Sequence, residues 1–250
     1  IHDITNSPSG LVVMNETIKP IAGRVFIKVQ DPRGWFIDAL NTLSHTSQTS
    51  GIHPSAHVHE NAQIGDNVSI APYAVIENNT VIGPDCKIGP YVYIADGTIL
   101  EENITIQAHT SVGTSGLSFH EKPSKTHVFF PHVGSTIIGA NTTIGAHCTI
   151  VRGILNNTEI GSSAEIGNHV NIGHNCNVGS GSFISSGVIL TGSSKVKDRA
   201  RLAAGVIVNA YCEIGSDAHV GLGSVVVKNI PDGKRYFGNP ARPLPTMKDF

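Results

Sequence analysis

A six-residue repeat of branched aliphatic side chains runs through most of this 250-residue chain. Each step of six from Ile52 to Val112 lands on isoleucine, valine or leucine; after a break the pattern resumes at Ile138 and, with one four-residue slip, continues to Val226. The repeating positions are Ile52, Val58, Ile64, Ile70, Ile76, Ile82, Ile88, Ile94, Leu100, Ile106, Val112, Ile138, Ile144, Ile150, Ile160, Ile166, Ile172, Val178, Ile184, Leu190, Val196, Leu202, Val208, Ile214, Val220 and Val226. Such a repeat constrains the fold strongly, because each unit must stack on its neighbours.

The period of six fits neither an amphipathic helix nor a simple alternating strand. It fits a triangular coil in which each hexad forms one flat face. Three hexads, about 18 residues, then return the chain to a point one strand spacing, about 4.8 Å, above its start. The repeating aliphatic side chains would fill the interior in ladders. Hexapeptide repeats of this kind are typical of the left-handed parallel β-helix, which we expect over residues 51–229.

A second regular position lies four residues after each repeating residue, and it usually carries a small side chain. All four cysteines occupy it: Cys86, Cys148, Cys176 and Cys212. We therefore expect them to be buried, reduced and inert, and no C-x-x-C pair indicates a disulfide or a metal site. Glycine often follows the repeating residue directly, as at Gly65 and Gly167, and we interpret these glycines as meeting the need of a turn for a permissive backbone.

Two segments interrupt the repeat. The larger, 113–136, carries Phe119 and His120 among several aromatic and histidine side chains, and the smaller is the slip within 152–157. Insertions into a repeat protein project from one edge and often carry function. We favour a substrate cleft lined by the larger loop over the alternative that its phenylalanines only pack it against the coil.

Both ends of the chain lie off the repeat. Residues 1–50 include an alternating segment, 24–29, that predicts a strand, and a segment with helical periodicity, 32–43, that begins with proline. Residues 230–250 are too rich in proline and glycine to continue the coil, so we expect them to cap it or to fold back along it.

The composition excludes several classes of partner. Charged residues make up 14% of the chain and the net charge is −2, so there is no basic field for a phosphate backbone and we expect no nucleic-acid partner. No apolar stretch is long enough to span a membrane. A cytoplasmic protein is the resulting expectation.

Among the 13 histidines, His174 stands out. It follows Ile172 by two positions, where we expect it to lie outward on a flat face of the coil, and Gly192 lies 18 residues further on, one coil higher. An imidazole is a suitable base for an amine or hydroxyl that attacks a thioester. A glycine stacked beside it would let its backbone N–H approach a developing oxyanion. From the residues alone, an outward, solvated histidine remains the alternative.

The chain resembles the UDP-3-O-acylglucosamine N-acyltransferase family of lipid A biosynthesis. The segments GTSGLSFHEKP, IIGANTTIG, RGILNNTEIG and NHVNIGHNCNVG fall in the order of that family's substrate loop and catalytic hexads. The resemblance implies His174 as general base and Gly192 as oxyanion donor. Substrate-binding residues carried over with these segments are Phe119, His120, Asn156, Asn157, Asn171 and Tyr211. Residues 1–50 resemble the end of the family's uridine-binding domain.

The chain also departs from the family pattern. Val151, Asn156 and Asn157 replace aspartates that flank the RG motif, Tyr211 stands where the family has a second histidine, and the ending GNPARPL resembles coenzyme A dependent acetyltransferases. Two donors therefore remain open: an acyl carrier protein thioester, as the family implies, or a coenzyme A thioester in a sugar N- or O-acetyltransferase. No tightly bound cofactor is expected.

Two further alternatives remain open at this stage. A zinc enzyme of the γ-carbonic anhydrase type would share the coil, and His169 and His174 have a suitable spacing, although no third ligand is evident and we expect no metal. A purely structural coil would need neither the loop nor the extra ends. For each of the enzymatic hypotheses, the architecture implies a parallel homotrimer with the active site between neighbouring subunits.

Overall fold

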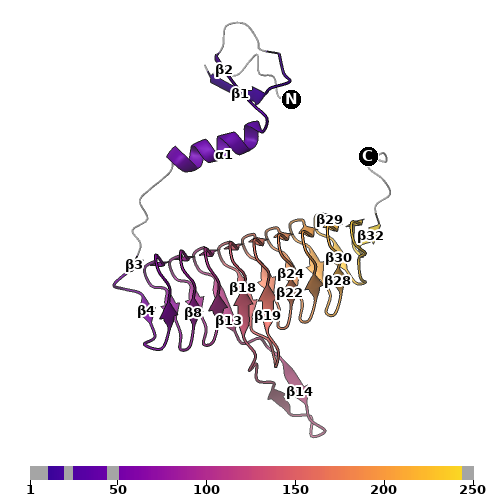
Figure 1. The fold of residues 1–250 in the computed structure, drawn as a ribbon. Coiled ribbons are helices and arrows are strands. Elements are labelled where there is room, and N and C mark those ends of the chain that lie inside the picture. Colours follow the sequence, from indigo (N-terminus) through magenta and orange to yellow (C-terminus); the bar gives the residue numbers. More distant parts are fainter. Residues whose placement is uncertain (1–10, 20–24, 44–50, 244–250) are drawn as a thin grey trace. The chain divides into compact units, whose positions relative to one another are not determined.

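The computed structural model describes residues 11–19, 25–43 and 51–243 (Figure 1). The chain divides into two units, with the boundary between residues 49 and 50. The first unit contains two parallel strands, β1 (Leu11–Asn15) and β2 (Val25–Val29), and one helix, α1 (Pro32–Leu43). The strand and the helix expected in this region are confirmed. Asp31 caps the helix, because its Oδ1 accepts the backbone N–H of Gly34 at 3.1 Å.

The second unit is a parallel β-helix, as the repeat predicts. Its strands stack into three parallel sheets, so that the chain visits each face once per coil before it returns (Figure 1). We refer to these sheets as the eleven-stranded, nine-stranded and eight-stranded faces.

The eleven-stranded face contains β3 (Gly51–Ile52), β6 (Ser69–Ile70), β9 (Lys87–Ile88), β12 (Thr105–Ile106), β17 (Thr143–Ile144), β20 (Glu165–Ile166), β23 (Phe183–Ile184), β26 (Arg201–Leu202), β29 (His219–Val220), β31 (Arg235–Phe237) and β32 (Arg242–Pro243). The nine-stranded face contains β4 (His57–Val58), β7 (Val75–Ile76), β10 (Tyr93–Ile94), β13 (Ser111–Thr114), β18 (Thr149–Val151), β21 (Asn171–Ile172), β24 (Ile189–Leu190), β27 (Ile207–Val208) and β30 (Val225–Val226). The eight-stranded face contains β5 (Gln63–Ile64), β8 (Val81–Ile82), β11 (Ile99–Leu100), β16 (Thr136–Ile138), β19 (Thr158–Ile160), β22 (Asn177–Val178), β25 (Lys195–Val196) and β28 (Glu213–Ile214).

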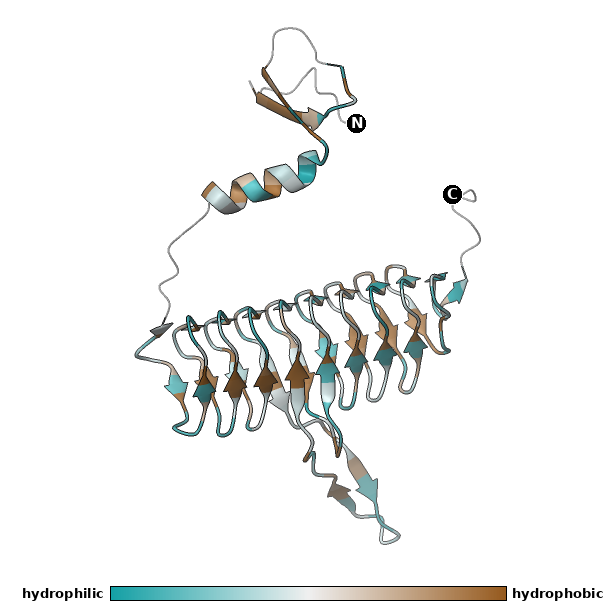
Figure 2. Ribbon diagram, in the orientation of Figure 1, coloured by the Kyte–Doolittle hydropathy of each residue, from teal (hydrophilic) through white to brown (hydrophobic). Residues whose placement is uncertain are grey.

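The repeating aliphatic residues form the core. In the regular coils each pairs with the residue 18 positions away, as Ile172 does with Leu190, so that identical positions stack directly above one another. Both side chains are fully buried, whereas Ile52 in the first described coil is 50% exposed. Figure 2 shows hydrophobic residues concentrated in the strands of the coil. The core is therefore a set of continuous aliphatic ladders.

The cysteines take the small interior position, as expected. All four are unpaired and buried. Burial raises the pKa of the Cys176 thiol, and also of the other three, which disfavours the reactive thiolate form. These thiols act as compact apolar side chains.

The glycines that follow the repeating residues are explained by close approach between coils, so the expectation based on turn conformation is wrong. The glycines with a left-handed backbone do not include Gly65 or Gly167. A Cβ at Gly65 would fall 2.7 Å from the backbone nitrogen of Pro84 in the next coil, and one at Gly167 would fall 2.6 Å from that of Ser186. Side chains are excluded there because the turns of successive coils stack with almost no space between them.

Most residues with a left-handed backbone conformation lie in the turns, three positions after a repeating residue. At one corner of the coil the residues at these positions carry aromatic or imidazole rings that stack on one another. At the turns between the eleven-stranded and nine-stranded faces, rings stack on successive coils with centroids 4.9–5.1 Å apart: Tyr73, Tyr91, His109, His147 and His169. All five have φ near +60°. This conformation is unfavourable for residues with a Cβ, and contact between the rings offsets part of its cost.

The carboxyl-terminal segment adds one more strand to the coil and then reverses. Strand β31 pairs in parallel with β29, so the eleven-stranded face continues past residue 230 despite the proline and glycine content. Strand β32 then pairs antiparallel with β31. The reversal ends the parallel stack on this face.

The ladders predict that substitutions at inward positions lower the free energy of unfolding much more than substitutions at outward positions. Ile166→Ala should lower the free energy of unfolding by about 2–5 kcal/mol, because a buried aliphatic side chain leaves a cavity between stacked coils. Its neighbour Glu165 points outward and is exposed, so Glu165→Ala should change stability by no more than about 0.5 kcal/mol. Urea unfolding of both variants measures the difference, and equal effects would contradict the assigned register.

Candidate active site

Both interruptions of the repeat open at one corner of the coil, where the nine-stranded face passes to the eight-stranded face. The larger loop connects β13 to β16, and segment 152–157 connects β18 to β19 in the next coil. The turn with His174 follows between β21 and β22, and the turn with Gly192 between β24 and β25. Four successive coils thus place both interruptions, His174 and Gly192 on one edge. We call this edge the catalytic corner.

The larger loop is a β-hairpin that projects from the coil (Figure 1). Its strands, β14 (Phe119–Glu121) and β15 (His127–Phe129), pair antiparallel. A series of ring contacts leads from the hairpin to the coil: Phe119 to Phe129 at 6.4 Å between centroids, Phe129 to His132 at 6.0 Å, and His132 to His174 at 5.6 Å. The base of the hairpin therefore contacts the candidate general base.

His174 lies in the turn at the corner, not on a flat face as the sequence suggested. Its imidazole occupies the space above Gly192: a Cβ built on that glycine would collide with Nε2, Cε1 and Cδ2 of the ring. The backbone of the two coils is tied together as well, because Ser193 N–H donates to the His174 carbonyl at 2.8 Å. Only glycine at position 192 leaves room for the imidazole.

Asn175 determines which nitrogen of His174 carries the proton. Its Oδ1 lies 3.1 Å from His174 Nδ1 and also accepts the backbone N–H of Ile154 at 3.0 Å, while its Nδ2 donates to the Asn156 carbonyl at 3.2 Å. These partners orient the amide so that an oxygen faces the imidazole. Nδ1 must then be the donor, which leaves the lone pair on Nε2 beside Gly192. The tautomer that a general base requires is thereby favoured.

Segment 152–157 supports the turn through backbone and side-chain hydrogen bonds, while the side chain of Asn156 stays exposed. Asn157 Oδ1 accepts the backbone N–H of Ser135 at 3.2 Å, and Asn156 contributes its carbonyl to Asn175. Arg152 donates from Nε to the Gly134 carbonyl at 2.7 Å and from Nη2 to the Asp96 carbonyl at 3.0 Å. The four-residue slip thus joins the hairpin base to the turn that holds His174.

His132 is the most buried histidine at the catalytic corner. It is 5% exposed, its Nδ1 has no hydrogen-bond partner among the described residues, and Ser118 Oγ lies 3.5 Å from its Nε2. Burial lowers its pKa, and the positive charge that His174 would carry when protonated lowers it further. His132 therefore packs edge-on against His174 as a neutral ring.

The remaining predicted binding residues lie further from His174 in the described contacts. Phe119 is 59% exposed and His120 is exposed, and both lie on β14. Asn171 lies on the outer surface of β21, and Tyr211 is 81% exposed in the turn between β27 and β28. Tyr211 shares its left-handed position with Asn175, two coils below, so it lines the same corner without touching the imidazole.

Sequence reasoning missed three residues that shape this corner: Asn175, His132 and Arg152. Asn175 could have been found, because an asparagine that follows a candidate base and takes a left-handed turn position is placed to bond locally. His132 was visible only as one of several histidines in the loop, and Arg152 only as part of a motif. Their partners come from coils far away in sequence, which a linear pattern does not reveal.

The spacing that suggested a zinc enzyme does not bring its histidines together within the chain. His169 belongs to the ring ladder at the corner between the eleven-stranded and nine-stranded faces, whereas His174 lies at the catalytic corner. Across residues 11–19, 25–43 and 51–243, no group of three or more histidine, cysteine, aspartate or glutamate side chains could hold a metal ion. Nor is any described helix long and apolar enough to cross a membrane.

Comparison with known proteins identifies the class of this coil. Residues 48–78 and 79–114 match the family described as bacterial transferase hexapeptide (six repeats), and residues 135–155 match the hexapeptide repeat of succinyl-transferase. Residues 152–246 match the GMPPB C-terminal domain. A solved UDP-N-acetylglucosamine acyltransferase from Francisella novicida superposes with a TM-score of 0.71 at 30% identity, over 78% of this chain and 70% of that one. The fold is the left-handed parallel β-helix of hexapeptide-repeat transferases.

Curated relatives place the chain within that class. An acyl-[acyl-carrier-protein]–UDP-N-acetylglucosamine O-acyltransferase from Ectopseudomonas mendocina is 35% identical over 197 residues, 77% of this chain and 72% of the relative. A UDP-3-O-acylglucosamine N-acyltransferase from Methylobacterium nodulans is 32% identical over 141 residues, and the match spans only 40% of that relative's length. The chain belongs to the hexapeptide-repeat acyltransferase family, and the resemblance read from its motifs is confirmed.

The lowered pKa of His132 predicts that the stability of the hairpin base depends on pH. Because its folded pKa is depressed below the ordinary value of 6.5, the contribution of His132 to stability is present above that pH and is lost as the pH falls further. The protection factors of amides at the hairpin base, which compare hydrogen exchange with its intrinsic rate at each pH, should therefore fall below about pH 6.5. His132→Gln should remove this acid dependence. A wild-type profile that stays flat down to pH 5 would contradict the assignment.

Proposed function

We propose that this protein transfers an acyl group from a thioester to the amine of a nucleotide-linked amino sugar. One observation carries the proposal: Nδ1 of His174 lies 3.1 Å from Asn175 Oδ1, and its Nε2 faces Gly192 at the corner where the hairpin and segment 152–157 meet. Family membership and the names of the relatives support the same chemistry.

The reaction follows from this arrangement. The acceptor amine attacks the thioester carbonyl while Nε2 of His174 takes a proton from the nitrogen. In this proposal the Gly192 N–H donates to the oxyanion of the tetrahedral intermediate. Collapse of the intermediate breaks the carbon–sulfur bond, and the proton on His174 goes to the departing thiolate. The products are an amide and a free thiol.

A hydroxyl acceptor is the second candidate. The relative with the longer match, from Ectopseudomonas mendocina, is named as an O-acyltransferase that acts on UDP-N-acetylglucosamine. The base and oxyanion donor serve either acceptor, because both present a proton on the attacking atom. We favour the amine because the hairpin, the RG motif and the histidine hexad, which together resemble the N-acyltransferase family, are the segments that converge on His174.

The name of a relative also suggests the acyl donor. The name of the Ectopseudomonas mendocina protein gives an acyl carrier protein thioester as donor. We propose the same donor here, with coenzyme A thioesters as the alternative raised by the ending GNPARPL. The proposed substrate contacts are Phe119 and His120 of the hairpin, Asn171 on the nine-stranded face and Tyr211 above the base.

A homotrimer would complete the catalytic corner. Outward aliphatic side chains stack on the nine-stranded face in the carboxyl-terminal coils: Ile189 and Ile207 pair in register and are 39% and 37% exposed. Exposed apolar side chains grouped on a flat face are typical of an interface between subunits. Light scattering on the purified chain should give three times the mass of one chain.

Removal of the base tests the mechanism. His174→Ala should lower kcat by about 10²–10⁴-fold, because the attacking amine loses its proton acceptor. Gly192→Ala should have a comparable effect, since its methyl group would displace the imidazole. The assay follows thiol release and the mass of the product, with an amino-sugar and a hydroxyl acceptor, each supplied with acyl carrier protein and coenzyme A thioesters.

The matched control for this experiment is His57→Ala. His57 is an exposed residue of β4, five coils before β21 on the nine-stranded face, and its replacement should leave kcat at the wild-type value. Unchanged turnover in a folded His174→Ala protein would overturn the mechanism. Turnover with the hydroxyl acceptor alone would replace the amine by the second candidate.

A further inference from the structure

A groove lies on the eleven-stranded face at the carboxyl-terminal coils. It has a volume of about 450 Å³ and crosses strands β23, β26, β29 and β31. Outward side chains from each of these strands line it: Phe183, Arg201, His219 and Arg235. The eleven-stranded face does not form the catalytic corner, which lies between the other two faces. Within one chain the groove is therefore distinct from the catalytic corner.

The groove stacks basic side chains directly upon one another. Arg201 pairs in register with His219, and His219 with Arg235, so the three occupy consecutive strands about 4.8 Å apart. The residues that line the groove include no carboxylate. The nearest one in the same column, Glu165, lies beyond Phe183.

Two basic residues of the same coils have acidic partners. Lys197 forms an ion pair with Glu213 at 2.7 Å, and Arg199 forms one with Asp217 at 2.8 Å. In the part of the chain that the structure describes, neither Arg201 nor Arg235 forms an ion pair. Asp217, which pairs with Arg199, also interacts electrostatically with His219. The two unpaired guanidinium groups of Arg201 and Arg235 are complementary to an anion.

The shape of the groove indicates more than a simple anion. The side chain of Phe183 is 47% exposed at one end, although it borders an apolar floor that includes Ala203 and Gly221. An exposed aromatic ring beside guanidinium groups suits a ligand with a planar ring and a phosphate. From Phe183 to Arg235 the groove spans three strand steps, about 14 Å. This length accommodates a base, a ribose and two phosphates.

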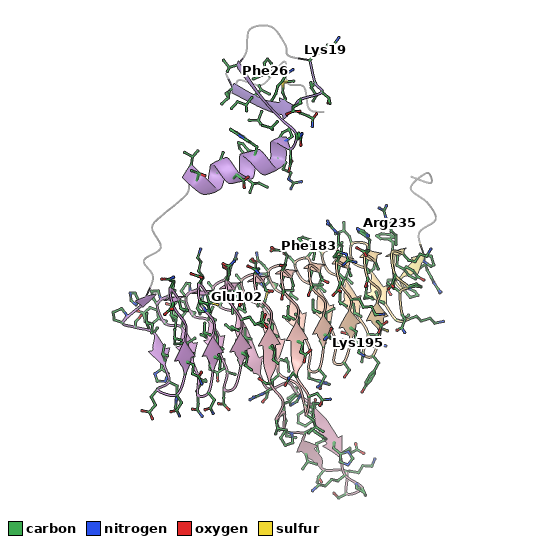
Figure 3. The ribbon with its side chains drawn as sticks, viewed as in Figure 1. Lys19, Phe26, Glu102, Phe183, Lys195 and Arg235 are labelled. Carbon is green, nitrogen blue, oxygen red and sulfur yellow. The ribbon has the colours of Figure 1, made fainter. Side chains whose placement is uncertain are left out.

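We propose that this groove binds a nucleotide, with the base against Phe183 and the phosphates on Arg201 and Arg235. Planar guanidinium groups bind phosphate oxygens in pairs, and the aromatic ring supplies contact to the base. The proposal goes beyond acyl transfer and does not depend on it. Figure 3 shows Phe183 and Arg235 along one side of the coil, with Lys195 away from them.

Isothermal titration of the full chain with ADP and with UDP tests the proposal. Arg201→Gln and Arg235→Gln should each weaken binding by about tenfold or more, the loss expected for a hydrogen bond to a charged group. Phe183→Ala should weaken nucleotide binding and leave the weaker binding of inorganic phosphate unchanged. Lys195→Gln removes the same charge from the exposed surface of the eight-stranded face and should bind nucleotide like the wild type.

Three results would overturn the proposal. They are the absence of nucleotide binding at millimolar concentration, binding that both arginine variants retain, and inorganic phosphate that binds as tightly as ADP. His174→Ala should leave nucleotide binding intact, so the loss of acyl transfer in that variant is distinguishable from failure of the groove.

Discussion

Backbone hydrogen bonding between successive coils is the constraint on which the structure depends. Each short strand bonds to the equivalent strand of the coil before and after it, and a shift of one residue would turn the buried ladder outward. The catalytic corner uses the same register. His174 and Gly192 meet because they are 18 residues apart and one coil apart, so that the geometry of the site is set by the packing of the core.

Both interruptions leave the interior ladders in register, and the β13–β18 pairing shifts only after Val112. The hairpin and segment 152–157 both leave and rejoin the coil at the same corner, and the strands on either side keep their partners, as Val112 does with Ile150 and Ile150 with Ile172. Because closing a longer surface loop costs little additional entropy, the coil tolerates them. The inserted segments then bond to each other and to Asn175, which fixes the orientation of the imidazole.

The repeat made most of the fold predictable, since a period of six determines both which residues face inward and which residues stack. It also placed Gly192 above His174 by simple counting. Conformation at the turns was harder to predict. The glycine at 167 reflects backbone contact with the next coil, and the turn position of His174 follows from where each face ends. Contacts of His132 and Arg152 depend on how an inserted segment folds back, which no repeat encodes.

The reversed strand at the carboxyl-terminal end has a consequence for assembly. A parallel β-helix presents unpaired backbone groups at each end, and a second molecule can in principle extend it into a fibre. Here β32 runs against the direction of the stack and contains Pro243, which has no backbone N–H to offer. On the eleven-stranded face, β32 therefore offers a second molecule a poorer edge for parallel extension than a regular coil would.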